Sequence, residues 1–258
     1  MSRVCVVFCF ILLTGCKSNF TRINLAGNIR KSNLQFEKRH YANYVIYAEQ
    51  PQRFSDTVFH GKLAVAIKRC KQILRIDTLK VHFEYVFVNS ANAMKKMAFG
   101  FDGQGIAFVD SKVVIEQATS RSNGYGAHEL FHVILYHQLG SLPKDAFTSE
   151  GFAVFSDNRW WGYDLHAMAN YITHKKQVSI ANIISDFRSN ELVSYPLSGS
   201  FIKFLYEKYG LEAVSHAYKN GMANIEVMTK KKLQDLESEW RYEIKDKDYS
   251  AISYPLGE

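Results

Sequence analysis

The sequence has few cysteines and no pair that is expected to form a disulfide. It contains 4 cysteines in 258 residues. Cys5 and Cys9 lie in an N-terminal segment that we expect to be removed, Cys16 follows that segment, and Cys70 has no partner. With 47% apolar residues, the chain can bury a substantial core without disulfides. A disulfide scaffold is therefore excluded, and one compact domain or two small lobes are expected.

The sequence also lacks a basic stripe, an internal repeat and a low-complexity tract. Its formal net charge is +7, but the basic residues are scattered except for the run Lys230, Lys231 and Lys232. No recognised nucleic-acid-binding motif accompanies them. We therefore expect no nucleic-acid partner.

No apolar run near the N-terminus is long enough to span a membrane. Arg3 precedes an apolar run over residues 4–13, which has the layout of a secretory signal. The following residues up to Cys16 complete the sequence Leu-Thr-Gly-Cys, which resembles a bacterial lipobox. The resemblance implies that residues 1–15 are a signal peptide and that the thiol of Cys16 is lipidated. A plain cleaved signal or a signal anchor is the alternative.

The lipobox resemblance also implies a location. It implies a lipid-anchored protein of the bacterial cell envelope, with the membrane as its partner. The residue after Cys16 is Lys17 and not aspartate, which by resemblance to bacterial sorting rules implies the outer membrane, facing the periplasm. Residues 16–39 are polar and have no sustained periodicity. We interpret them as a membrane tether.

The rest of the chain predicts an α+β fold, with an α/β lobe over residues 40–127 and a mainly helical lobe over residues 128–258. Strand-like segments and helical spacing alternate in the first lobe. Strands are expected over residues 41–49 and 79–89, and two short strands within residues 105–116 flank an expected turn at Asp110 and Ser111. Helices are expected over residues 59–76 and 90–97, and an Asn or Ser is expected to cap the second of them.

Residues 128–132 read HELFH and begin a predicted helix that runs up to Gly140. His128 and His132 lie about 40° apart on one helix face, so both imidazoles can reach one ion. Glu129 lies beside this pair. Zinc hydrolases need this arrangement, because two neutral imidazoles bind Zn²⁺ and the carboxylate takes a proton from water. The alternative is an amphipathic helix with two solvated histidines.

A third ligand is expected from a second helix. The pattern that supplies a third histidine fails, because Leu135 and Gln138 occupy the required Gly and His positions. His137 lies about 140° around the helix from His132 and does not replace it. The segment SEGFAVFSD, residues 149–157, provides Glu150 instead.

The helix that carries Glu150 is expected to be capped by Thr148 or Ser149. Asp157 lies seven positions after Glu150 and hence on the same helix face. It can support the site by accepting a hydrogen bond from a ligand histidine. Alternatively, it is a charge at the helix end on a solvated face.

HELFH followed by SEGFAVFSD resembles the gluzincin, or MA-like, zinc metallopeptidases, in which HExxH is joined by a glutamate in an E-G-x-A type segment. The segments YPLSGSFIKFLYEKYG and LQDLESEWRYEI resemble, more weakly, the segment after the active site and the terminal helix of bacterial members. The resemblance covers about residues 120 to 245. It implies a zincin-like catalytic domain with a mixed sheet above the active-site helix.

The resemblance further implies how a substrate is held. In this fold an edge strand before the zinc helix pairs with extended peptide, and residues 105–116 are the candidate, where Gly105 and Ala107 allow close approach. An ordinary hairpin is the alternative. Tyr195 lies just before Pro196 and an expected turn at residues 198–200. It is expected to donate to the oxyanion, with a core or surface tyrosine as the alternative.

Two histidines flank an expected aromatic helix after Trp160 and Trp161. These are His166 and His174. A lone histidine is more often a packed or exposed side chain than a catalytic one. We therefore interpret both as packed or exposed side chains.

Together these features predict a zinc-dependent peptidase that hydrolyses peptide or protein substrates in the envelope. Zn²⁺ is bound by His128, His132 and Glu150, and Glu129 is the catalytic base. One alternative is a zinc-binding lipoprotein without turnover that recognises a peptide or an assembly partner. The intact Glu129 argues against it, because a pure binding site needs no base. The other alternative is a purely structural lipoprotein in which both zinc motifs arise by chance.

Overall fold

The computed structural model describes residues 22–51, 56–118 and 127–256. The chain divides into two compact units, residues 1–138 and 139–258. The expected signal peptide and Cys16 lie outside the described residues. Within the described ranges, no helix has both the length and the apolar character needed to cross a membrane.

The first unit contains a mixed five-stranded sheet with the strand order β1-β2-β3-β5-β4. The central strands β2, β3 and β5 are parallel, and the two edge strands β1 and β4 are antiparallel to their neighbours. The predicted strands are confirmed, as is the hairpin turn between β4 and β5. The strands are β1 (Phe36–His40), β2 (Tyr44–Glu49), β3 (Phe83–Val88), β4 (Gly105–Phe108) and β5 (Val113–Gln117).

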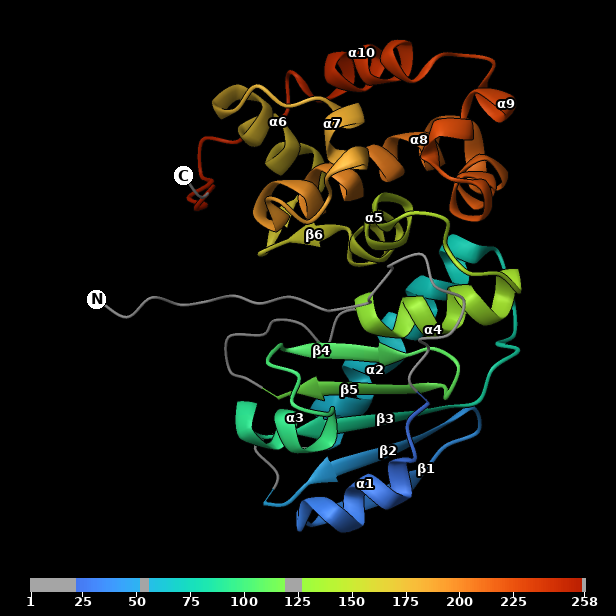
Figure 1. Ribbon diagram of the computed structural model, residues 1–258, viewed down its shortest axis with the longest axis vertical. Coiled ribbons are helices and arrows are strands. Elements are labelled where there is room, and N and C mark those ends of the chain that lie inside the picture. The colour runs from blue at the N-terminus through green and yellow to red at the C-terminus, as the bar shows by residue number, and fades with distance from the viewer. Residues whose placement is uncertain (1–21, 52–55, 119–126, 257–258) are drawn as a thin grey trace. The chain divides into compact units, whose positions relative to one another are not determined.

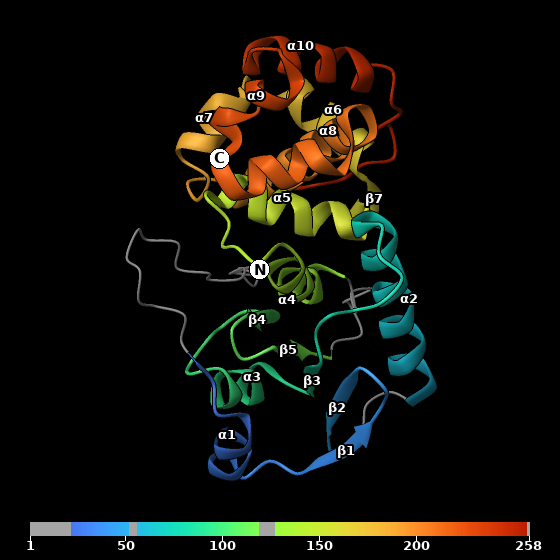
Figure 2. The same cartoon turned by 90° about the vertical axis from the view of Figure 1, so that its right-hand side faces the viewer.

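Helices cover both faces of this sheet. Its helices are α1 (Leu25–Ser32), α2 (Asp56–Leu74), α3 (Ala91–Met97) and α4 (His128–Leu139). In the two views α1 and α3 lie on one face and α2 on the other (Figures 1 and 2). The predicted serine cap of α3 is confirmed, because the side chain of Ser90 accepts a hydrogen bond from the backbone N–H of Ala93.

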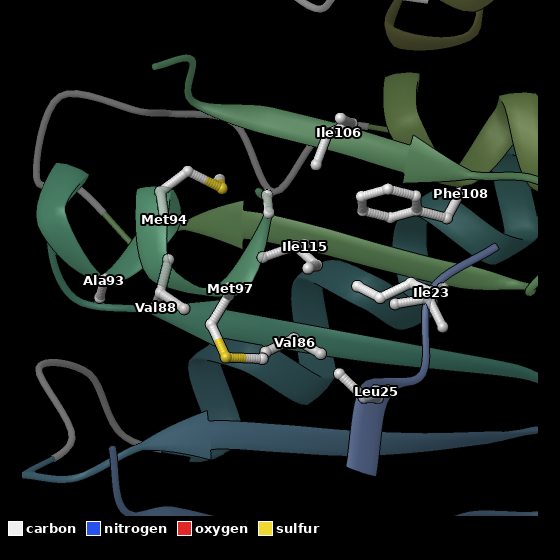
Figure 3. Packing of buried hydrophobic residues seen from close by; sticks show 12 residues of the cluster. Ile23, Leu25, Val86, Val88, Ala93, Met94, Met97, Ile106, Phe108 and Ile115 are labelled. Atoms are coloured by element: carbon white, nitrogen blue, oxygen red, sulfur yellow. The ribbon is translucent and has the colours of Figure 1, made fainter. Parts of the chain in front are cut away.

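A hydrophobic cluster fills the face that α1 and α3 cover (Figure 3). Alternate strand residues such as Val86, Ile106 and Ile115 point into it and meet Met94 and Met97 of α3. Since side chains alternate along a strand, Gly105 and Ala107 of β4 face the opposite side of the sheet. That opposite side carries α4.

The expected tether is wrong for residues 22–39, which belong to the folded first unit. Ile23 and Leu25 are buried in the same cluster, and α1 and β1 follow them. The backbone N–H of Ile23 donates to the hydroxyl of Ser111 at 3.0 Å. The sequence of this segment is polar because only a few of its residues face the core. Strand β1 is an edge strand that is held by its hydrogen bonds with β2, so it needs no apolar sequence pattern.

A truncation that starts at residue 40 is therefore expected to unfold or strongly destabilise the first unit. Loss of Ile23 and Leu25 alone removes about 3 to 6 kcal/mol of apolar burial, a large part of a typical domain stability. A matched truncation that starts at residue 22 keeps both side chains. Chemical denaturation of the two should show a clear loss of stability only for the shorter chain, and equal midpoints would contradict this assignment.

The second unit is mainly helical, as expected, and adds a two-stranded ribbon of β6 (Arg159–Trp160) and β7 (Tyr163–Asp164). Its longest helix, α8, is interrupted at Gly210, whose φ of 81° and ψ of 178° are not helical. The helices are α5 (Ala146–Asp157), α6 (Leu165–Lys175), α7 (Ile180–Ser185), α8 (Glu191–Asn220), α9 (Glu226–Thr229) and α10 (Leu233–Ile244), with a 3₁₀ turn at Met222–Asn224.

The boundary between the units lies between Gln138 and Leu139, whereas the sequence placed it before His128. The reason is that α4 is held to the sheet of the first unit. The Nε2–H group of His137 donates to the carbonyl of Val109 at 2.9 Å, and the hydroxyl of Tyr136 donates to Asp110 at 3.0 Å. The helix ends at Gly140, as predicted, with a φ of 65°.

Candidate metal centre

Two of the predicted ligands lie on α4 in the first unit. The rings of His128 and His132 are one helical turn apart, with centroids 5.0 Å apart and planes at 83°. His132 is buried and His128 is half-buried. Both imidazoles are therefore on one helix face, as the HExxH spacing predicts, and one of them is accessible to water.

The predicted base lies against the edge strand of the sheet. Glu129 is only 6% exposed. A Cβ atom placed on Gly105 of β4 would lie 2.9 Å from Cγ of Glu129 and 3.3 Å from Cγ of Glu116. A side chain at position 105 would thus displace Glu129. The glycine that the sequence analysis associated with close backbone approach provides the space in which this carboxylate lies.

The C-terminal half of α4 is fixed by its contacts with the β4–β5 turn. Burial first, and then the hydrogen bond to Asp110, raise the pKa of Tyr136, so this hydroxyl stays protonated as a donor. His137 donates to the carbonyl of Val109. The histidine that the sequence excluded as a ligand therefore has a structural contact in the first unit.

The third predicted ligand, Glu150, lies on α5 in the second unit and is 0% exposed. The predicted caps Thr148 and Ser149 are wrong, because α5 begins three residues earlier. Asp145 is the N-cap, and its carboxylate accepts from the backbone N–H of Thr148 at 2.7 Å. As a result Glu150 lies inside the helix and not at its first turn.

The glycine that follows Glu150 lets two helices of the second unit approach closely. A Cβ atom on Gly151 would lie 2.9 Å from the backbone carbonyl of Ser198 on α8. A Cβ atom on Gly199 of α8 would collide with Val154 of α5. Close packing of α5 against α8 therefore explains why a glycine follows Glu150, since the backbones of the two helices are in contact there.

Arg188 is a site residue that the sequence analysis missed. Its guanidinium contacts the carboxylate of Glu150 at 3.4 Å, the hydroxyl of Tyr195 at 2.9 Å and the carboxylate of Glu191 at 2.9 Å. Burial disfavours the charged guanidinium, but the surrounding Tyr195, Glu150 and Glu191 outweigh it and raise the pKa of Arg188. Arg188 is therefore a fixed positive charge beside Glu150. No local motif marks it in the sequence.

Tyr195 lies inside α8, so the expected turn after it is wrong. Pro196 is tolerated there although it has no N–H to donate to the carbonyl of Leu192. The hydroxyl of Tyr254 donates to that carbonyl at 2.9 Å instead. Tyr195 itself is fully buried, and its ring stacks on Trp160 with centroids 5.5 Å apart.

Asp157 is the last residue of α5 and is half-buried. Asn158 follows it with a φ of 56° and ends the helix. The contact of Asp157 with a ligand histidine stays a prediction. Within the second unit, the structure brings Glu150 and Tyr195 together through Arg188.

The structure therefore describes two groups of site residues, in which every member except Arg188 was predicted from the sequence. The group in the first unit contains two imidazoles and the base Glu129 beside an edge strand. The group in the second unit contains a buried carboxylate, an arginine and a tyrosine hydroxyl. No protein-family model matches the chain, and no curated protein matches its sequence.

Proposed function

We propose that this chain is a zinc-dependent peptidase of the gluzincin type that cleaves peptide bonds in the bacterial cell envelope. The observation that carries the proposal is the position of Glu129. This buried carboxylate is on the same helix as the imidazole pair and lies against Gly105 of edge strand β4. A zinc site without turnover has no need of a base at this place.

The donor set fits Zn²⁺. His128, His132 and Glu150 supply two imidazoles and one carboxylate, a ligand set that catalytic zinc sites use together with one water. Arg188 beside Glu150 favours the ionised carboxylate, which is the form that binds metal. A half-buried His128 is compatible with access of water to the open position.

When bound, Zn²⁺ would act as a Lewis acid toward a water molecule and the scissile carbonyl. Glu129 accepts a proton from the attacking water and later donates it to the leaving amine. Tyr195 donates its phenolic hydrogen to the developing oxyanion, while Arg188 donates to the phenolic oxygen and orients the hydroxyl. These steps assign a role to each polar side chain in the two groups.

Strand β4 gives the substrate a place to bind. Among the described strands, β4 is at the edge of the sheet, so its outer side can pair with an extended peptide. Such pairing places a peptide backbone next to Gly105 and hence next to Glu129. The mixed sheet with an antiparallel edge strand and α4 on one face supports the proposal of a zincin-like domain.

The envelope location is part of the same proposal and rests on the lipobox-like sequence at Cys16. A lipid on this thiol would hold the enzyme at the membrane. Membrane fractionation of a Cys16→Ser variant tests this, since a lipid-anchored protein would be released or left unprocessed. Unchanged fractionation and an unchanged mature mass would count against it.

Metal removal tests the activity directly. We expect the purified chain to cut members of a peptide library, to lose this activity after dialysis against a chelator, and to regain it when Zn²⁺ is added back. Cleavage sites are measured by mass spectrometry, with Mg²⁺ added in place of Zn²⁺ as the control. Zinc binding without cleavage of any peptide would favour the non-catalytic zinc-binding lipoprotein instead.

A further inference from the structure

A second cluster of metal-ligating side chains lies in the helical unit and shares no residue with the groups described above. It consists of His166 on α6, Glu207 on α8 and Glu243 on α10. Nε2 of His166 is 3.6 Å from a carboxylate oxygen of Glu207 and 3.9 Å from one of Glu243. One atom from each residue lies within 4.8 Å of the other two. Each of three helices therefore places one potential metal-ligand atom in the same small region.

His166 is held with one ring nitrogen directed at the two carboxylates. Its side chain is only 4% exposed. Nδ1 lies 2.8 Å from the hydroxyl oxygen of the buried Ser200, which also accepts a hydrogen bond from Nε1 of Trp240 at 3.0 Å. These contacts fix the ring orientation from behind, as the partners of metal-binding histidines do. Nε2 is buried and makes no hydrogen bond within the described part of the chain.

The distances distinguish a shared cation from a hydrogen bond. An Nε2–H group that donated to a carboxylate would lie about 2.7 to 2.9 Å from the oxygen. Two ligands of one tetrahedral zinc ion, each about 2.0 to 2.2 Å from it, are about 3.3 to 3.6 Å apart. The observed separations of 3.6 and 3.9 Å are longer than a hydrogen bond and need at most a few tenths of an ångström to reach that spacing.

The charges also favour a divalent cation. Glu207 and Glu243 each bring a carboxylate oxygen close to the buried imidazole nitrogen of His166. The side chains of Glu207 and Glu243 are 48% and 41% exposed, which leaves them accessible to an ion from solution. A buried imidazole that faces two carboxylates is a poor site for Ca²⁺ or Mg²⁺, which prefer oxygen ligands, but suits Zn²⁺.

We propose that His166, Glu207 and Glu243 form a second divalent metal site that binds Zn²⁺ and ties α6, α8 and α10 together. Nε2 of His166 and one oxygen from each carboxylate are the protein ligands, and water completes the coordination. Ser200 orients the histidine. The site is independent of the proposed peptidase centre, because it shares no residue with it.

The test counts bound Zn²⁺ on the full chain by equilibrium dialysis and metal analysis. A Glu207→Gln, Glu243→Gln double variant should bind about one Zn²⁺ per chain fewer than the wild type, and Zn²⁺ should raise its melting temperature less. Both carboxylates are at the surface, so the variant is expected to fold. Glu212→Gln, an exposed glutamate on α8, is the matched control and should bind as the wild type does.

The result that overturns the proposal is an equal zinc count in the wild type and the double variant. Because the readout is the difference between these two proteins, it is independent of zinc at His128, His132 and Glu150. A His166→Gln variant should show the same loss as the double variant if it folds. Displacement of this zinc by an equal concentration of Mg²⁺ would also contradict the assigned metal class.

Discussion

Replacing Glu129 by glutamine is expected to leave zinc bound and to lower peptide hydrolysis about 10³-fold. Glutamine keeps the size and hydrogen-bonding reach of the side chain, so it fits the space beside Gly105. It does not accept a proton at neutral pH, and the attacking water is then not activated. The effect should appear in kcat and in kcat/KM together, because the lost interaction belongs to the transition state.

The control for this experiment is Glu226→Gln, which makes the same change on an exposed residue of α9. It should retain both zinc and full activity. Zinc content is measured on the same samples that are used for kinetics. Full activity of the Glu129 variant would show that another group takes the proton, and loss of its zinc would leave the catalytic role unassigned.

The second large effect is expected from the proposed ligands. His132→Ala and Glu150→Ala should each lower the zinc affinity of the peptidase centre by more than about 100-fold, because even residues behind the ligands change metal affinity by about 10 to 100-fold. Activity should fall in parallel. The two residues lie on different helices, α4 and α5, so equal losses would show that both helices contribute to one site.

The matched control for these variants is His174→Ala, since His174 is an exposed histidine on α6. Zinc is counted as the difference from the wild type, so an ion bound at His166 does not affect the result. We expect one equivalent fewer for each ligand variant and no change for the control. A Glu150→Ala variant that retains all its zinc would remove the downstream glutamate from the ligand set.

The sequence was sufficient for features that depend on neighbouring residues. The HELFH helix and its end at Gly140 follow from helical periodicity and a left-handed glycine. The β4–β5 hairpin follows from two short β-prone segments around a turn, and Ser90 follows from the chemistry of helix caps. In each case the residues that carry the signal lie close together in the sequence.

Local rules failed where a distant group changed the outcome. Thr148 and Ser149 are both acceptable caps, but Asp145 also accepts a hydrogen bond from the backbone N–H of Met222, which ties the start of α5 to a remote turn. Residues 198–200 suggest a turn, yet the helix continues through them. Pro196 is accommodated because the hydroxyl of Tyr254 satisfies the helix carbonyl that proline leaves without a donor. Neither partner is recognisable from the local sequence.

Arg188 shows the same limit within the proposed site. The chain has 32 lysines and arginines, and nothing in its local sequence distinguishes this one. Only the fold brings its guanidinium to Glu150, 38 positions away in the chain. The same holds for His166, which has the appearance of a lone histidine until α8 and α10 place Glu207 and Glu243 beside it.

The sequence by itself determined the spacing of HELFH on one helix face and the residue types that can bind zinc and move a proton, because a helix places residues four apart on one side regardless of its surroundings. The tertiary structure decided that residues 22–39 are part of the fold and that Arg188 lies beside Glu150. It also decided that a glycine of the edge strand makes room for Glu129. These features depend on burial and on contacts between residues far apart in the chain, which no local pattern encodes.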